Sequence, residues 1–184
     1  METQPQQSPF DGLRIVLFGP ESTGKSTLAK QLAQHFNTQW VPEFARDYLQ
    51  HKWDTKGEVC NQQDLLTIAE GQLTWENKHA AMAQRFLFCD TNIRVTQIWS
   101  ETHFNGYCDP KIKRWTQLLQ YDHYFLTDID IPWEADDLRD CPNDRAQMKN
   151  TFHEHLLQGG CSFTEISGSK SERFQKAIAV LESL

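Results

Sequence analysis

The sequence lacks long apolar runs and paired cysteines. No apolar run approaches the ~18 residues that a membrane-spanning helix needs, and the start METQPQQSPFDG has neither the basic flank nor the apolar segment of a signal peptide. The five cysteines are odd in number and scattered, without C-x-x-C spacing, which excludes a zinc site of that type and a disulfide framework. We therefore expect a cytoplasmic protein with reduced thiols and no membrane partner.

A surplus of basic residues is also missing. Lys and Arg together number 18 against 25 Asp and Glu, which gives a formal net charge of −7. Because nucleic-acid phosphates are bound through such a surplus, we expect no nucleic-acid partner. A small anionic ligand in a local basic pocket stays compatible with this charge.

The length of 184 residues allows one domain with a proper core and is too short for two ordinary ones. We interpret residues 1–11 as a disordered lead-in and residues 12–184 as a single domain, with a lid around residues 133–147. The sequence does not predict the oligomeric state.

Apolar strand-like segments alternate with amphipathic segments along the chain. The predicted strands are 13–18, 38–44, 85–90, 121–127 and 161–167, and the predicted helices are 25–36, 61–84, 91–101, 143–157 and 171–184, the last capped by Ser171. This order predicts a three-layer α/β fold, with helices on both faces of a five-stranded parallel sheet. Ligands of such folds lie beyond the carboxyl ends of the strands.

The first strand leads into a phosphate-binding loop. Residues 19–26, GPESTGKS, match G-x-x-x-x-G-K-[ST] at every fixed position, between a predicted strand and a predicted helix. Glycines let successive N–H groups point at phosphate oxygens, and the new helix adds its positive end. The alternative is a glycine-rich turn without a ligand. We expect ATP and Mg²⁺ here, bound by Gly19, Glu21, Ser22, Thr23, Gly24, Lys25, Ser26 and Thr27, with Lys25 on the β- and γ-phosphates and Ser26 on the metal. The sequence leaves the choice between ATP and GTP open.

Asp90 ends the apolar segment RFLFCD. A carboxylate there faces the phosphate loop across the sheet edge, where it can hold Mg²⁺ or accept a proton from a substrate hydroxyl. Asn92, with Thr91, can contact the substrate; capping of the next helix is the alternative for all three residues. The sequence has no N-K-x-D motif, and no glutamate follows Asp90, so phosphoryl transfer to a hydroxyl fits better than a GTPase or a motor.

Four further groups of residues are candidates. Glu43 and Arg46 lie three residues apart at a helix start, where an acceptor substrate can bind, or form a surface ion pair. Trp99 and Trp133 can stack on a planar base, or belong to the core.

Arg139 and Arg145 lie in an acid-rich segment, where a mobile lid can bring arginines to the transferring phosphate; a solvated charged loop is the alternative. Ser167 and Gly168 can wrap the adenine edge, or form a plain turn.

Several of these segments together resemble one known family. GPESTGKSTLA, VPEFARDYL, FCDTNIRVTQIWSE and DIPWEADDLRD, in this order, are similar to the nicotinamide riboside kinase domain of NadR and its stand-alone AAA-domain relatives. The resemblance covers residues 13–184 and implies a P-loop, nucleoside-kinase-like fold and ATP-dependent phosphorylation of the 5′-hydroxyl of nicotinamide riboside. It also implies that Glu43 and Arg46 lie by the substrate, Asp90 at the ribose and metal, and Arg139 in the lid.

Two departures from NadR limit the inference. The H-x-G-H signature of its nucleotidylyltransferase domain and a helix-turn-helix region are absent, and Pro42 stands where better-known members carry an aromatic residue. The residues thus favour a nucleoside kinase. A P-loop module that binds ATP and switches a partner, and a kinase of another small hydroxyl substrate, stay open.

Overall fold

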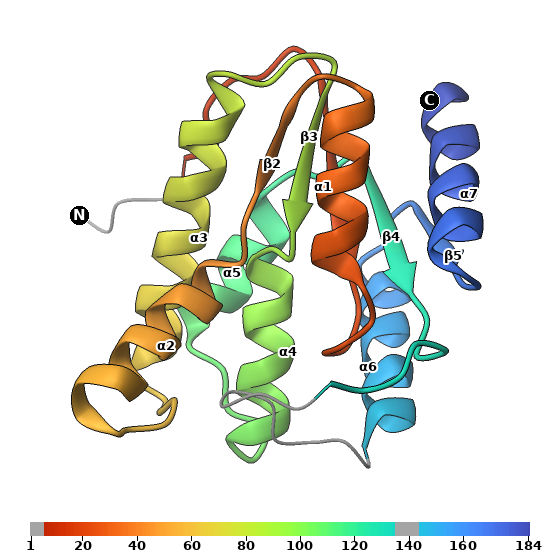
Figure 1. Ribbon diagram of the computed structural model, residues 1–184. Coiled ribbons are helices and arrows are strands. Elements are labelled where there is room, and N and C mark those ends of the chain that lie inside the picture. Colours follow the sequence, from red (N-terminus) through yellow and green to blue (C-terminus); the bar gives the residue numbers. More distant parts are fainter. Residues whose placement is uncertain (1–5, 135–143) are drawn as a thin grey trace.

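Five parallel strands form one sheet. The computed structural model describes residues 6–134 and 144–184 (Figure 1). The strands are β1 (Leu13–Phe18), β2 (Gln39–Val41), β3 (Phe86–Asp90), β4 (His123–Thr127) and β5 (Phe163–Ile166), in the order β2-β3-β1-β4-β5. The predicted α/β fold with a five-stranded parallel sheet is confirmed.

Helices cover both faces of this sheet. In the described part of the chain they are α1 (Lys25–His35), α2 (Phe44–Lys56), α3 (Asp64–Ala80), α4 (Ile93–His103), α5 (Pro110–Leu118), α6 (Arg145–Gln158) and α7 (Lys170–Glu182). Helices α1 and α7 pack on one face, and α3, α4 and α6 pack on the other. Helix α5 packs on α3 and α4 in a third apolar cluster, outside these two interfaces.

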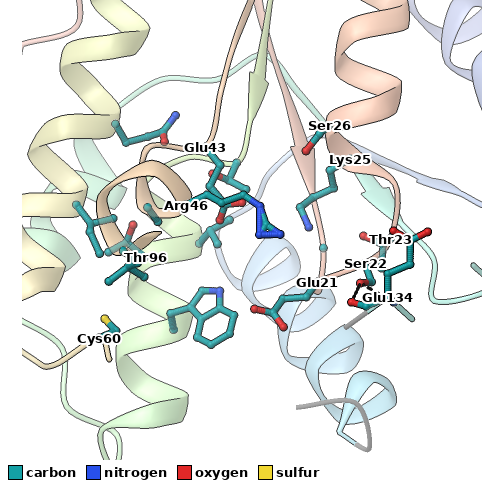
Figure 2. A pocket seen from close by; sticks show the side chains of 18 of the residues that line it. Glu21, Ser22, Thr23, Lys25, Ser26, Glu43, Arg46, Cys60, Thr96 and Glu134 are labelled. Atoms are coloured by element: carbon teal, nitrogen blue, oxygen red, sulfur yellow. Dashed lines mark hydrogen bonds between the residues drawn. The ribbon is translucent and has the colours of Figure 1, made fainter. Parts of the chain in front are cut away.

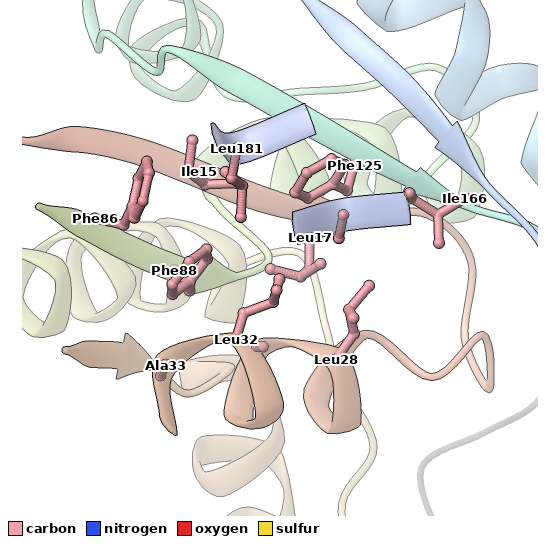
Figure 3. Close-up of a cluster of buried hydrophobic side chains, with 12 residues drawn as sticks. Ile15, Leu17, Leu28, Leu32, Ala33, Phe86, Phe88, Phe125, Ile166 and Leu181 are labelled. Atoms are coloured by element: carbon pink, nitrogen blue, oxygen red, sulfur yellow. The ribbon is translucent and has the colours of Figure 1, made fainter. Parts of the chain in front are cut away.

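The core lies between the sheet and these two helix layers. Figure 3 shows the cluster under α1 and α7, which includes Ile15, Leu17, Leu28, Leu32, Phe86, Phe88, Phe125, Ile166 and Leu181. Each such side chain contributes about 1.5–3 kcal/mol by leaving water. The three central strands, β1, β3 and β4, are buried along almost their whole length, as expected for the interior of a parallel sheet.

Strand β1 is the centre of the sheet. Leu17 is in register with Asp90 of β3, and Phe18 is in register with Leu126 of β4. The loops that follow these three strands therefore leave the sheet side by side at its carboxyl edge.

The structure differs from the predicted elements in several places. Helix α5 was not predicted, although Asp109 caps it and Pro110 occupies its first position. The cap of α7 is Ser169, which forms a capping box with Glu172, so the prediction of Ser171 was wrong. In this box the Ser169 amide donates to the Glu172 carboxylate and the Glu172 amide donates to the Ser169 hydroxyl. Helix α7 therefore begins at Lys170, before Ser171.

Residues 6–10 are packed on the domain, which contradicts a disordered lead-in over these residues. The Ser8 amide donates to Asn77 Oδ1 at 2.7 Å, and Gln7 exchanges hydrogen bonds with the backbone of Gln120. Phe10 packs against the apolar cluster between the sheet and α3. The part of the proposed lead-in at residues 1–5 lies outside the described residues.

No helix of the described residues is both long and apolar enough to span a membrane.

Candidate active site

A cavity of about 500 Å³ opens at the carboxyl edge of the sheet (Figure 2). Five regions line it: the phosphate loop with the first turn of α1, helix α2 with residues on either side of it, helices α3 and α4 with their neighbours Thr91 and Phe104, the residues Ile131, Pro132 and Glu134, and Lys170 at the start of α7. All eight phosphate-loop residues named from the motif, Gly19, Glu21, Ser22, Thr23, Gly24, Lys25, Ser26 and Thr27, belong to the lining.

The backbone of the phosphate loop needs its glycines. Gly19 has φ +141°, and a Cβ on it would lie 2.6 Å from Thr127 Oγ1. Gly24 has φ +79° and caps α1 without a side chain. Buried Thr23 holds the loop closed, because its hydroxyl donates to the Pro20 carbonyl at 2.8 Å and lies 2.6 Å from the Thr127 hydroxyl. The loop is therefore a folded turn, fixed to β4 through Thr127.

The first turn of α1 presents a cation and a hydroxyl. Lys25 Nζ donates to the Pro20 carbonyl at 2.6 Å, and Ser26 Oγ donates to Asp90 Oδ2. This turn holds no acidic residue, so the positive end of the helix stays uncompensated by its own side chains. The arrangement suits an anion.

Asp90 is almost completely buried, with 2% of its surface exposed. Burial raises the pKa of its carboxyl group, while Lys25, the Ser26 hydroxyl and Arg46 act in the opposite direction. Its Oδ1 atom is buried without a hydrogen-bond partner among the described residues. A hard cation prefers such oxygens, so the Ser26–Asp90 pair fits Mg²⁺.

Thr91, directly after Asp90, also lines the cavity and has φ +70°, a strained value for a β-branched residue. Its amide donates to the Leu17 carbonyl at 3.1 Å, which fixes the end of β3 against β1. Such strain concentrates at functional sites.

Glu43, Arg46 and Trp99 line the cavity opposite the phosphate loop. Figure 2 shows Arg46 from α2 pointing into the same space as Lys25 and Glu21. The Trp99 ring stacks on His103 at 4.1 Å between centroids, and both line the cavity together with Phe104. The structure thus brings the predicted acceptor residues to the predicted phosphate site.

Asn92 and Trp133, which were also predicted to contact the substrate, are not among the residues that line the cavity. Asn92 caps α4 by accepting from the Arg94 amide, and its Nδ2 donates to the Tyr124 hydroxyl. These contacts occupy its amide, so capping, the alternative interpretation, describes Asn92 here. Trp133 is half-buried, and its Nε1 has no hydrogen-bond partner among the described residues.

Arg145 begins α6 and donates to the carbonyl oxygens of Ser22, at 3.1 Å, and Ile131, at 3.0 Å. It therefore touches the backbone of the phosphate loop from outside. The last three residues of the predicted lid belong to α6, and Arg139 lies outside the described residues. The lid stays a prediction.

Ser167 and Gly168 form the turn between β5 and α7. Gly168 has φ +97°, and its amide donates to Asp130 Oδ2 at 2.5 Å. Lys170, at the start of α7, lines the cavity.

The sequence did not reveal the far wall of the cavity. Helix α3 and the segment before it contribute Glu58, Val59, Cys60, Leu65, Ile68 and Gln72. These residues form no motif, and Leu65 and Ile68 read as an ordinary core face of a helix. Arg173, which bonds to the phosphate loop, was also missed.

The parallel strand order and the glycine loop define a P-loop protein with the fold of nucleoside and nucleotide kinases. The chain belongs to the AAA domain family, whose match covers residues 14–173. It is 26% identical to the trifunctional NAD biosynthesis/regulator protein NadR of Escherichia coli (strain K12), over 96% of this chain and 43% of the relative. NadR of Salmonella typhimurium matches with the same identity and coverage. The resemblance predicted from the motifs is thus confirmed, although the chain spans less than half of these relatives.

Solved structures show the same fold. A crystal structure of NadR in complex with NR has a TM-score of 0.74 at 18% identity and covers 94% of this chain and 51% of that chain. A deoxyadenosine kinase from M. mycoides has a TM-score of 0.66 at 12% identity, with 94% and 100% covered. A thymidylate kinase from Ehrlichia chaffeensis has a TM-score of 0.65 at 13% identity, again with 94% and 100% covered.

Proposed function

We propose that this protein is an ATP-dependent kinase that transfers the γ-phosphate to the 5′-hydroxyl of nicotinamide riboside. One observation carries the proposal: a single cavity joins the phosphate loop to Glu43, Arg46 and Trp99, with Asp90 hydrogen-bonded at the junction through Ser26. A donor nucleotide and an acceptor alcohol can therefore meet in one cavity, which is what phosphoryl transfer requires.

The charge of the cavity supports a nucleoside acceptor over a phosphorylated one. Among the described lining residues, the acidic side chains are Glu21, Glu43, Glu58 and Glu134, and the basic ones are Lys25, Arg46 and Lys170. Lys25 and Glu21 belong to the phosphate loop, and Glu134 is hydrogen-bonded to Ser22 of that loop. Around α2 the lining therefore carries Glu43 and Glu58 against Arg46, a small acidic surplus on the acceptor side. The pyridinium ring of nicotinamide riboside is cationic and planar, and it suits such a surface beside Trp99. The similarity to NadR points to the same acceptor.

In this proposal the loop amides of residues 19–26 hold the triphosphate, and Lys25 stabilises the charge that builds up on the transferred group. Asp90 orients the acceptor hydroxyl and takes its proton. Mg²⁺, when bound by Ser26 and Asp90, supplies charge neutralisation on the phosphates. Arg139 stays a predicted lid residue, and Ser167 and Gly168 a predicted adenine contact.

The direct test measures ADP release with a coupled assay across a panel of nucleosides that includes nicotinamide riboside. We expect this riboside to stimulate release most strongly. If ATP binds but no nucleoside raises release above the slow reaction with water, the chain is a nucleotide-binding module and the kinase proposal is wrong.

Glu43→Ala tests the acceptor side separately. Loss of a hydrogen bond to a charged group costs about 1.5–3 kcal/mol, so the acceptor KM should rise roughly 10- to 100-fold while the ATP KM stays unchanged. Asp47→Ala is the matched control, because Asp47 is exposed on the same helix. If the two substitutions have equal effects on the acceptor KM, Glu43 is not part of the acceptor site.

A further inference from the structure

Arg173 is a buried cation on α7, outside the lining of the cavity, with 3% of its surface exposed. Its Nη1 donates to the Thr23 carbonyl at 2.7 Å, its Nε to the Gly168 carbonyl at 2.8 Å and its Nη2 to the Asp128 carbonyl at 3.1 Å. The same Nη2 forms an ion pair with Asp130. One guanidinium group therefore joins the segments that follow β1, β4 and β5.

Arg145 makes a parallel contact one residue earlier in the phosphate loop. It donates to the carbonyl of Ser22 and to that of Ile131. Two consecutive carbonyls of the loop, those of Ser22 and Thr23, are thus each held by an arginine that approaches from outside the loop.

The hydrogen bonds from these two arginines to the loop carbonyls fix the direction of the neighbouring loop amides. In a planar trans peptide the C=O and N–H groups point in opposite directions. The structure has no cis peptide bond among its described residues, so holding the carbonyls of Ser22 and Thr23 sets the direction of the Thr23 and Gly24 amides. A row of amides that converge on one point is what binds a phosphate.

We propose that Arg173 and Arg145 are positioning residues that orient two peptide planes of the phosphate loop toward the donor phosphates, without touching the nucleotide themselves. The proposal rests on the proposed function in that it takes a nucleotide as the ligand of the loop. It assigns Arg145 a role on the loop backbone, different from the direct contact with the transferred phosphate that the sequence suggested. Arginine suits this role because its rigid planar fork presents donors to several separate carbonyls at once, which the single flexible ammonium group of lysine does less well.

The test measures the affinity for ADP with magnesium, and separately for nicotinamide riboside, by calorimetry. We expect Arg173→Gln and Arg145→Gln each to weaken ADP binding about tenfold or more, and to leave the affinity for the riboside within twofold. Arg173→Lys should recover part of the loss. Arg85→Gln is the control, since exposed Arg85 reaches the opposite end of α7 through the Leu181 carbonyl at 3.4 Å and should not affect ADP.

The outcomes separate the two proposals. If the unchanged protein binds no nucleotide, the proposed function fails. Suppose instead that the unchanged protein binds ADP. If both glutamine variants are folded, as judged by circular dichroism, and bind ADP equally well, only the positioning role is wrong. Parallel losses of ADP and riboside affinity would show a merely structural role and also overturn it. Should Arg173→Gln fail to fold, Arg145→Gln alone decides, because half-buried Arg145 lies at a helix start.

Discussion

Replacing Glu76 by glutamine tests how burial and pH together act on the stability of this fold. Glu76 lies on α3 with 1% of its surface exposed, and the Tyr121 hydroxyl donates to both of its carboxylate oxygens, at 3.0 and 2.9 Å. Burial raises the pKa of the carboxyl group from 4.5 to about 7, although Tyr121, Arg14 and Gln7 oppose the rise. The folded chain therefore keeps this proton at pH values where an unfolded chain has lost it.

The sign of the effect follows from proton binding. Below pH 4.5 both states are protonated, and the stabilising contribution is fully present. Between pH 4.5 and 7 only the unfolded state has released the proton, so the free energy of unfolding falls as pH rises, and above pH 7 the loss is complete. The difference between a pKa of about 7 and one of 4.5 corresponds to about 3 kcal/mol.

Glu76→Gln keeps an acceptor for Tyr121 and has no proton to lose. Chemical denaturation at pH 5 and pH 8 should show the variant gaining about 2–3 kcal/mol relative to the unchanged protein between these two values. Glu70→Gln is the control, because Glu70 is exposed on the same helix and should follow the unchanged protein. A difference between Glu76→Gln and the unchanged protein that is the same at both pH values would refute the reasoning.

Three further substitutions test other parts of the structure. Lys25→Ala should abolish phosphoryl transfer in the coupled assay yet leave a cooperative thermal transition, because the Lys25 side chain lines the cavity and is not part of the buried apolar core. Phe152→Ala should lower the free energy of unfolding by about 3–5 kcal/mol, measured with urea, since the ring is 1% exposed and meets Phe18 at 4.8 Å. Gly71→Ala should cost about 1–3 kcal/mol and raise the acceptor KM more than the ATP KM, because its Cβ would lie 2.2 Å from Phe44 at the start of α2. An acceptor KM unchanged by Gly71→Ala would show that the position of α2 does not govern the acceptor site.

Local patterns predicted the sheet and the phosphate loop well. The central strands β1 and β3 are short, mostly apolar runs. The motif at residues 19–26 has both of its glycines, and its lysine and serine, at the required spacing. Asp90 was identified because it ends such a strand, and parallel strands bring their carboxyl ends together. These features depend on neighbours in the sequence or on a simple rule of topology.

The rest depends on contacts between distant residues. Arg173 lies 150 positions from Thr23 and has no motif around it, so its role could not be predicted. Asn92 was assigned to the substrate because it follows Asp90, but the nearby Tyr124 hydroxyl takes its amide. Helix α5 is polar around most of its surface, and its start depends on a proline that was not considered as a first helical position.

The packed segment of residues 6–10 bears on how the protein should be shortened for expression. A truncated chain that starts at residue 12, where composition alone draws the domain boundary, would remove the Ser8 carbonyl from Arg14 and the Ser8 amide from Asn77. It would also strip Phe10 from the apolar surface beside α3. Such a truncation leaves residues 19–26 unchanged in sequence and yet removes contacts from one end of α3, the helix whose other end lines the cavity.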